Sequence, residues 1–224
     1  MKTGMQPDIS KFNPTEDRLA DFRQALGNFP TGVTIITCMS QNGPLGITVN
    51  SFTSVSLEPP LIMWCLNKQS KRFSSFMDAE NFAVHIMPIG SKNLCVSFAK
   101  SSQAFEHADW SLSRQQVPIL KDSLVCFECR QFADYDGGDH SILLGLVDLV
   151  STKRGIPLTF AQGRFVECQS CWSSYGFRLG HFLLRLLPVS ASTSACYCCT
   201  LRRPRRGKTP RWTLRTQLSE SARL

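Results

Sequence analysis

The stretch GITVNSFTSVSLEPPLIMWCL, residues 46–66, mixes neutral polar and apolar side chains in a way that suits neither a buried strand nor a surface loop. It contains no charged side chain before Glu58. If residues 46–57 form one extended strand, alternate side chains lie on opposite faces. One face is then neutral and polar around an aromatic ring: Thr48, Asn50, Phe52, Ser54 and Ser56. The other face is apolar: Ile47, Val49, Val55 and Leu57.

Strands are expected on both sides of this stretch. After the break at 58–60, LIMWCL at 61–66 is a short apolar run typical of a strand buried on both faces. Before it, residues 33–38 alternate with a period of two and predict a strand, and the cluster at 41–44 predicts a turn. The quoted stretch therefore belongs to a series of consecutive strands.

The N-terminal part of the chain predicts an amphipathic helix. Asn13-Pro-Thr-Glu16 is typical of a helix start, with Asn13 as the cap and a glutamate at the position of a capping box. Leu19, Phe22 and Leu26 then recur at helical spacing, and Gly27 is suited to the helix end.

Downstream, the pattern predicts a short helix over 73–78, a strand around 82–86 and a helix that Ser91 caps. Residues 100–122 show no regular period. Two further strands, at 123–132 and 140–150, are joined by a turn. A chain of 224 residues that is 42% hydrophobic can form one domain with a core. We therefore predict a mainly β domain with a few helices, in which closure into a small barrel would remove exposed sheet edges.

The net charge of +8 is concentrated at the C-terminal end. Residues 1–167 carry 15 Lys and Arg against 16 Asp and Glu, whereas residues 168–224 carry 10 against 1. We therefore divide the chain into an arm at 1–12, a domain at 13–167 and an irregular basic tail at 168–224. We expect the tail to be disordered and without function, although Trp212 among arginines also suits contact with RNA, DNA or an anionic membrane.

Other features bear on the cellular compartment. No apolar segment follows Met1 and Lys2, and no run of about 18 apolar residues occurs, so we expect a soluble, cytoplasmic protein without a membrane partner. The ten cysteines should then be mostly reduced thiols.

Two pairs of cysteines have the spacing of a zinc site: Cys126 with Cys129, and Cys168 with Cys171. A separation of three along a strand directs Cys126 and Cys129 to opposite faces, so we predict no metal site.

The neutral polar face suits a flat heterocycle that offers carbonyl and ring-nitrogen positions, whereas a metal ion requires carboxylate, imidazole or thiolate ligands. Ser70, Lys71 and Arg72 provide cationic and amide donors for a phosphate group at a turn that opens a helix. A heterocycle with a phosphate indicates flavin mononucleotide (FMN). The alternative is an ordinary hydroxyl-rich edge strand followed by a solvated turn.

Five segments carry a resemblance to a known family. They are FPTGVTIIT (29–37), GITVNSFTSVSLEPPLIMWCL (46–66), NFAVHIM (81–87), residues 94–100 and GGDHSILLGLV (137–147). In order and spacing they resemble the flavin reductase family with the FMN-binding split barrel, over roughly residues 19–166. The resemblance implies a homodimeric split β-barrel that transfers a hydride from NADH or NADPH to FMN or FAD and supplies reduced flavin to a partner monooxygenase.

The resemblance also implies roles for individual residues. His140 would be the catalytic residue that faces the nicotinamide. Residues near the phosphate would be Ser70, Lys71 and Arg72, with Ala99 and Lys100 closing the site. The remaining flavin contacts would be Thr31, Thr48, Val49, Asn50, Ser51, Phe52, Ser54 and Phe165, the last of which is often tyrosine in relatives.

Alternatives remain open at this point. The chain could keep its FMN and reduce another acceptor, or it could bind flavin for electron transfer without turnover. His140 could be an exposed turn histidine, and His85 is expected to be a packed or surface residue. Hydride transfer needs no protein nucleophile, so the absence of a hydrolytic triad pattern agrees with the reductase hypothesis.

Overall fold

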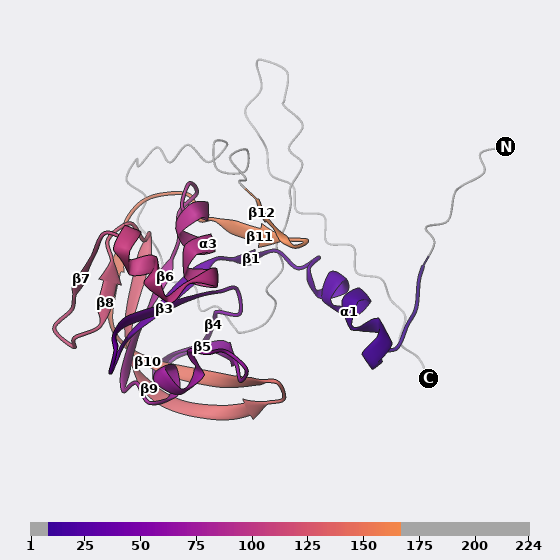
Figure 1. The fold of residues 1–224 in the computed structure, drawn as a ribbon, viewed down its shortest axis with the longest axis horizontal. Helices are drawn as coiled ribbons and strands as arrows, with labels where there is room; N and C mark the ends of the chain where they lie inside the picture. Colours follow the sequence, from indigo (N-terminus) through magenta and orange to yellow (C-terminus); the bar gives the residue numbers. More distant parts are fainter. Residues whose placement is uncertain (1–8, 167–224) are drawn as a thin grey trace, which may run out of the picture. The chain divides into compact units, whose positions relative to one another are not determined.

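A computed structural model of the chain describes residues 9–166, except for the side chains of residues 102 and 103 (Figure 1). The prediction of a disordered basic tail, the domain boundary at 167, the Cys168–Cys171 pair and most of the N-terminal arm lie outside the described residues.

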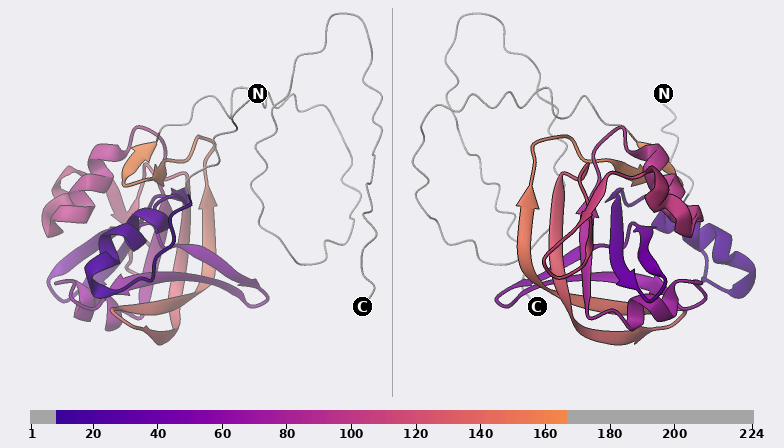
Figure 2. Two further views of the ribbon diagram at one scale, coloured as in Figure 1. Left: turned by 90° about the vertical axis from the view of Figure 1, so that its right-hand side faces the viewer. Right: turned by 60° about the vertical axis from the view of Figure 1, so that its left-hand side comes forward.

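The fold is built on one antiparallel sheet of seven strands that curves into an open barrel (Figures 1 and 2). Its strand order is β3-β2-β6-β9-β10-β5-β4. The bounds are β2 Thr34–Ser40, β3 Gly43–Val49, β4 Thr53–Leu57, β5 Pro60–Asn67, β6 Asn81–Ile86, β9 Val125–Gly137 and β10 His140–Thr152. The two edges of this described sheet, β3 and β4, do not pair with each other and are joined only by residues 50–52. The barrel is therefore split at this seam, and the mainly β fold class is confirmed.

Smaller elements surround the sheet. A three-stranded sheet has the order β1-β11-β12, and β7 pairs with β8. The strand bounds are β1 Thr31–Gly32, β7 Trp110–Leu112, β8 Pro118–Leu120, β11 Thr159–Ala161 and β12 Arg164–Val166. The helices are η1 Glu16–Arg18, α1 Leu19–Leu26, α2 Phe73–Met77, α3 Lys92–Lys100 and η2 Ser102–His107. The predicted helix at 73–78, the strand at 82–86 and a helix after Ser91 are confirmed, although Ser91 makes no side-chain capping bond. The strands β1, β7, β8, β11 and β12 were not predicted.

The prediction of one strand over 46–57 is wrong. The chain leaves β3 after Val49 and enters β4 at Thr53, so the two halves belong to opposite edges of the sheet. Phe52 turns inward with Val49, and its ring stacks on Phe127 at a centroid distance of 5.7 Å. Leu57, expected on the apolar inner face, is 93% exposed. The predicted division of faces therefore fails beyond the seam.

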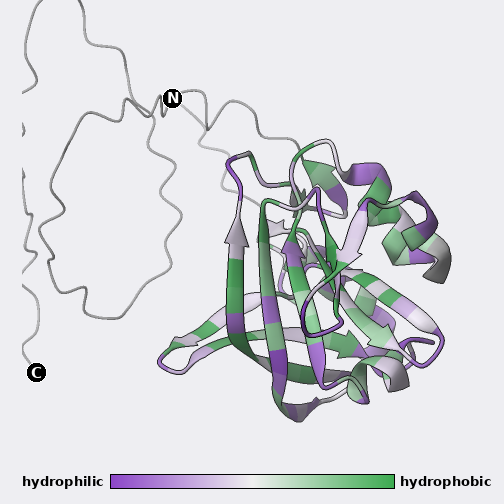
Figure 3. Ribbon diagram, turned by 90° about the vertical axis from the view of Figure 1, so that its left-hand side faces the viewer, coloured by the Kyte–Doolittle hydropathy of each residue, from purple (hydrophilic) through white to green (hydrophobic). Residues whose placement is uncertain are grey.

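Apolar side chains fill both faces of the sheet, and Figure 3 shows the apolar residues spread along its strands. One cluster of buried residues includes Trp64, Phe76 and Phe82, a second includes Ile35 and Phe98, and a third includes Ala83 and Val117. Cys126 and Cys129 belong to different buried clusters, which confirms that their side chains leave the strand on opposite faces. In β5, Met63 and Cys65 are only half-buried, so burial on both faces is incomplete.

The N-terminal helix differs from its prediction. Its first turn is the 3₁₀ segment η1 rather than an α-helix capped by Asn13, and its N-cap residue Thr15 makes no side-chain capping bond. Leu19, Phe22 and Leu26 are 54%, 41% and 60% exposed, and no side chain of α1 is buried by the described residues. The amphipathic pattern therefore forms a helix whose apolar face lacks a covering element in the described part of the chain.

Gly46 allows α3 to lie close to β3. A Cβ atom at this position would be 2.5 Å from Cε1 of Phe98, which is itself buried. Gly46→Ala is therefore expected to displace α3 and to lower the free energy of unfolding by roughly 1.5 kcal/mol. Urea unfolding measures the loss. Gly32→Ala is the matched control, because nothing lies within 4 Å of its Cβ position, and an equal loss in both variants would contradict the explanation.

Candidate functional site

Five of the predicted phosphate-side residues line a single cleft of about 750 Å³. Ser70, Lys71 and Arg72 belong to the turn after β5, and Ala99 and Lys100 end α3. The turn forms because its own polar groups satisfy one another. The amide of Ser70 donates to the carbonyl of Asn67 at 3.0 Å, and the amide of Arg72 donates to Oγ of Ser70 at 3.2 Å.

The cleft is electropositive. Lys71 and Lys100 are exposed and form no ion pair with any residue that the structure describes. No carboxylate is among the described residues that line the cleft. Hydroxyl groups add neutral donors, and Ser70 retains its hydroxyl hydrogen because Oγ accepts in the turn. Two free ammonium groups beside hydroxyls are suited to bind a phosphate group.

Arg72 has a different role from the two lysines. Its Nη1 donates to the carbonyl oxygen of Phe98, in the last turn of α3, at 3.0 Å. Partial burial lowers the pKa of this guanidinium below its usual range. Arg72 therefore attaches the turn to α3, and the expectation that it contacts phosphate remains a prediction.

The neutral segment and the phosphate turn converge on the same helix. Thr48 Oγ1 donates to the carbonyl of Cys95 at 2.7 Å, while Arg72 bonds the carbonyl of Phe98. These two carbonyls are three residues apart, or about 4.5 Å along a helix axis. Thr48 and the phosphate turn therefore contact α3 within one helical turn of each other, and the contact of one flavin with both segments remains a prediction.

Ser51 holds the seam of the barrel together. Its Oγ accepts a hydrogen bond from the amide of Cys65 at 2.9 Å and lies 3.3 Å from the carbonyl of the same residue, to which it donates. The pairing of β4 with β5 ends at Met63, so the Ser51 hydroxyl bonds the amide and carbonyl of Cys65 in place of a neighbouring strand. The predicted contact of this hydroxyl with flavin competes with these two bonds, whereas Asn50 beside it is exposed and has no side-chain bond within the described residues.

Ser51→Ala is expected to lower the free energy of unfolding by about 1 kcal/mol, because the Cys65 amide loses its acceptor at the half-buried seam. Thermal unfolding measures the change. Ser54→Ala on the exposed edge strand β4 is the control and should leave stability nearly unchanged. Equal effects of the two substitutions would show that the seam bonds do not contribute.

Thr31 and Asn50 line a second cavity, of about 870 Å³, between α1 and the β11–β12 turn. The Thr31 Oγ1 atom is buried and has no partner among the described residues. The predicted contacts are therefore divided between two cavities. Val49 and Phe52 pack against one buried cluster, Phe165 packs against the other, and Ser54 is exposed on β4.

His140 begins β10 opposite Asn67, so it lies beside the start of the phosphate turn. Its Nδ1 is 2.7 Å from Oδ1 of Asp139, and this contact lowers the pKa of the Asp139 carboxyl. The side chain is 38% exposed, and Nε2 has no partner within the described region. His140 therefore lies at a partly exposed turn, and its Nε2 atom is available to a ligand. Its catalytic role remains a prediction.

Ser40, Asn42 and Ser75 also line the cleft, although the sequence predicted no site role for them. The sequence of the turn at 41–44 indicated only a hairpin.

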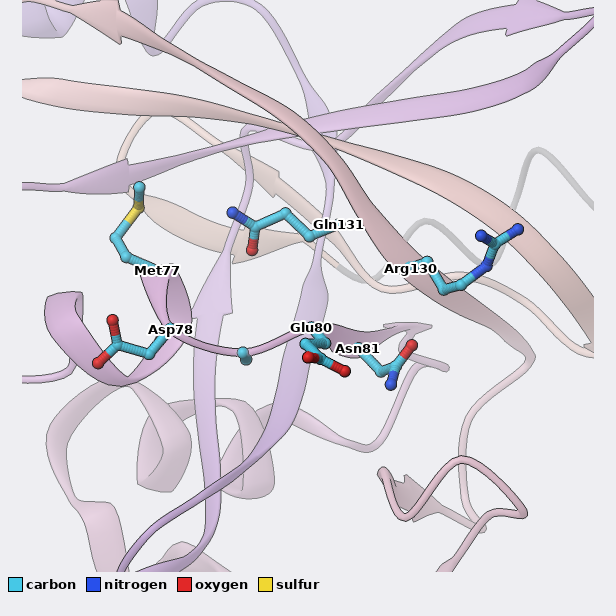
Figure 4. A pocket seen from close by; sticks show the side chains of 7 residues that line it. Met77, Asp78, Glu80, Asn81, Arg130 and Gln131 are labelled. Carbon is cyan, nitrogen blue, oxygen red and sulfur yellow. The ribbon is translucent and has the colours of Figure 1, made fainter.

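Another hollow, of about 440 Å³, is lined by residues 77–81, Arg130 and Gln131. It contains Asp78 and Glu80, and Figure 4 shows the guanidinium of Arg130 directed away from Gln131. Because these carboxylates repel anions, the hollow is a poorer phosphate site than the cleft.

The residues of the cleft fit a flavin phosphate, since two cations without partners in the described structure face hydroxyls and no carboxylate. The profile of the flavin reductase like domain matches residues 26–169. The FMN reductase (NADH) SmoA of Agrobacterium fabrum is 41% identical over 159 residues, which are 71% of this chain and 91% of that protein.

Two further comparisons agree. The reductase component of the flavin-dependent trigonelline monooxygenase of Acinetobacter baylyi is 34% identical over 66% of this chain, which spans about half (49%) of that relative. The NADH:FAD oxidoreductase SgcE6 of Streptomyces globisporus is a solved structure with a TM-score of 0.67 and 32% identity, matched over 73% of this chain and 94% of that one. This chain belongs to the flavin reductase family.

Proposed function

We propose that this chain transfers a hydride from NADH or NADPH to FMN or FAD and supplies the reduced flavin to a partner monooxygenase. It is an NAD(P)H:flavin oxidoreductase. The observation that carries the proposal is the cleft with Lys71 and Lys100, which α3 connects to the neutral segment through Thr48 and Arg72. Relatives are named FMN reductase (NADH) and reductase component of a flavin-dependent monooxygenase.

The residues of the chain bind and align the two reactants. A bound flavin supplies the acceptor for the hydride, and no protein nucleophile is needed. Lys71 and Lys100 would hold the phosphate end of the flavin, and the exposed amide of Asn50 with the backbone of 50–52 would supply hydrogen bonds that stabilise negative charge on the ring. Nε2 of His140 is free to orient the nicotinamide, with Asp139 fixing the imidazole through Nδ1.

Oxidation of NADH and of NADPH by the purified chain tests the proposal. The rate should rise with added FMN or FAD and saturate. A tightly held flavin whose turnover depends on another acceptor would instead identify an FMN-retaining oxidoreductase. Flavin binding without oxidation of either nucleotide would identify a non-catalytic flavin-binding module and contradict the proposal.

We also propose that the chain acts as a homodimer. In β4, Leu57 pairs with Pro60, and in β5 the next residue, Leu61, pairs with Leu146 of β10. Leu149 and Val150 follow on β10 and are 55% and 48% exposed, and Leu57 on the edge strand β4 is 93% exposed. Exposed apolar side chains near an open sheet edge favour association with a second copy. Sedimentation velocity should give a dimer that Leu57→Asp weakens, and a monomeric wild type would contradict this assembly.

A cytoplasmic location is part of the same proposal. The described part of the chain contains five cysteines, and all of them are free thiols, as suits a reducing compartment. No helix among the described residues has the length and the apolar character needed to cross a lipid bilayer. We propose the monooxygenase as the protein partner, and neither a membrane nor a nucleic acid as a partner.

A further inference from the structure

Lys68 connects the two turns that form the candidate site. The phosphate turn follows β5, which ends at Asn67, and His140 opens β10 opposite that residue, so the β9–β10 hairpin ends beside the phosphate turn (Figure 1). The amide of Lys68 donates to the carbonyl of Asp139 at 3.0 Å. Its ammonium group donates to Oδ2 of Asp136 at 2.7 Å. Lys68 therefore bonds the end of the hairpin twice, through its backbone and through its side chain.

Asp136 links this ion pair to the turn of the hairpin. Its other oxygen, Oδ1, accepts from the amide of Gly138 at 2.9 Å, and Gly138 has a φ of +79°, a conformation that favours glycine. The next residue, Asp139, lies with Oδ1 2.7 Å from Nδ1 of His140. A continuous series of contacts thus runs from Lys68 through Asp136 and the turn to the imidazole.

We propose that Lys68 and Asp136 are positioning residues for hydride transfer, because their ion pair fixes His140 relative to the phosphate turn. The inference rests on the proposed function, in which the phosphate turn holds the flavin and His140 orients the nicotinamide. The donor and the acceptor of a hydride must be closely aligned, and a displacement of about 1 Å can lower the rate about a hundredfold. The pair acts through the turn that contains the histidine rather than through contact with a reactant.

The exposure of the pair separates this role from a contribution to stability. The side chains of Lys68 and Asp136 are 35% and 78% exposed, and ion pairs with this degree of exposure stabilise a fold only slightly. The bond from Lys68, followed by that from Gly138, lowers the pKa of the Asp136 carboxyl, so the pair is charged at neutral pH. Loss of the pair is therefore expected to affect the reaction rather than folding.

Stopped-flow reduction of FMN by saturating NADH or NADPH tests the proposal on the full chain. Lys68→Ala is expected to lower the rate constant about tenfold, while the dissociation constant for FMN stays within about twofold. Asp136→Asn keeps an acceptor for the Gly138 amide but removes the charge, and it should have the same effect. The double variant should lose no more than either single variant, because the two residues act as a unit. Lys68→Arg keeps the ion pair and should restore the rate to within about threefold of the wild type.

Lys121→Ala and Asp109→Asn are the matched controls, because this pair has the same two bonds at another place in the fold. The Lys121 ammonium donates to Oδ1 of Asp109 at 2.8 Å, and its amide donates to the carbonyl of Asp109 at 2.9 Å. Neither residue is among the described residues that line the phosphate cleft. Both controls should keep the rate constant within about twofold of the wild type.

Each outcome decides the proposal. Unchanged rates in Lys68→Ala and Asp136→Asn overturn it and leave the reductase function intact. A loss confined to FMN affinity overturns it as well, because Lys68 would then act as a flavin contact. Additive losses in the double variant, no recovery in Lys68→Arg, or an equal loss in the controls also contradict it. If the wild-type chain reduces neither FMN nor FAD, the proposed function itself fails, and that result is distinct from a loss confined to the variants.

Discussion

Replacing Lys71 and Lys100 together with alanine is expected to raise the dissociation constant for FMN about 30-fold. Both lysines line the phosphate cleft, and neither has an ion-pair partner among the described residues, so their charge is available to a ligand. Because both lysines are exposed, each contact with the phosphate contributes about 1 kcal/mol to the binding free energy, which is less than a buried ion pair contributes. The effect should shrink as ionic strength rises, because salt screens exposed charges.

Riboflavin provides the internal control, because it has the same ring and ribityl chain without a phosphate. Its affinity should stay within about twofold in the double variant. Lys11→Ala with Lys92→Ala removes the same net charge from exposed lysines outside the cleft and controls for the overall field. If riboflavin weakens as much as FMN, or if the control pair weakens FMN equally, the cleft does not hold the flavin phosphate.

The fold class followed from the sequence because alternation with a period of two is a local property. The position of the seam did not follow from the sequence, because no residue within 46–57 marks a break in the strand. Neither Gly nor Pro occurs between Val49 and Thr53. The break is set by tertiary contacts, since Ser51 bonds Cys65 on β5 and Phe52 stacks on Phe127 of β9. A pattern confined to one segment cannot show that its two halves pair with different strands.

Only the part of the candidate site that lies within one segment was predictable from the sequence. The turn at 70–72 has a composition typical of anion binding, so its own residues indicate it. Its proximity to Lys100 and Thr48 depends on α3 lying over β3, which the sequence indicated only through the family resemblance. Asn42 lines the same cleft, but a turn residue gives no local sign of the groove beside it.

Acidification from pH 7 to pH 4 is expected to lower the free energy of unfolding by about 3 kcal/mol through His85 alone. His85 is fully buried, which lowers its pKa from the usual 6.5 to about 4. Its Nδ1 donates to the carbonyl of Ile35 at 3.0 Å, and Nε2 accepts from the amide of Leu120 at 3.1 Å, so the ring is neutral in the fold. Between pH 6.5 and pH 4, His85 therefore binds a proton in the unfolded chain but not in the folded chain.

The pH range in which stability is lost separates His85 from the acidic groups, because the pKa values of both are lowered by folding. The pKa values of Asp136, Asp139 and Asp148 are lowered by Lys68, His140 and Arg130, so their contribution is present above about 3.8 and is lost only below it. The window between 6.5 and 4 therefore reports the histidine, whose contribution is complete above 6.5.

Urea unfolding at half-unit pH steps measures the slope in this window. His85→Gln keeps an amide donor and acceptor but does not titrate there, so its stability should be lower at pH 7 and nearly independent of pH down to 4.5. His107→Gln, which removes an exposed histidine instead, should retain the slope of the wild type. A slope that survives in the His85 variant would show that another group unfolds the protein in acid, and that the bridge from Ile35 to Leu120 is not the acid-sensitive contact of the barrel.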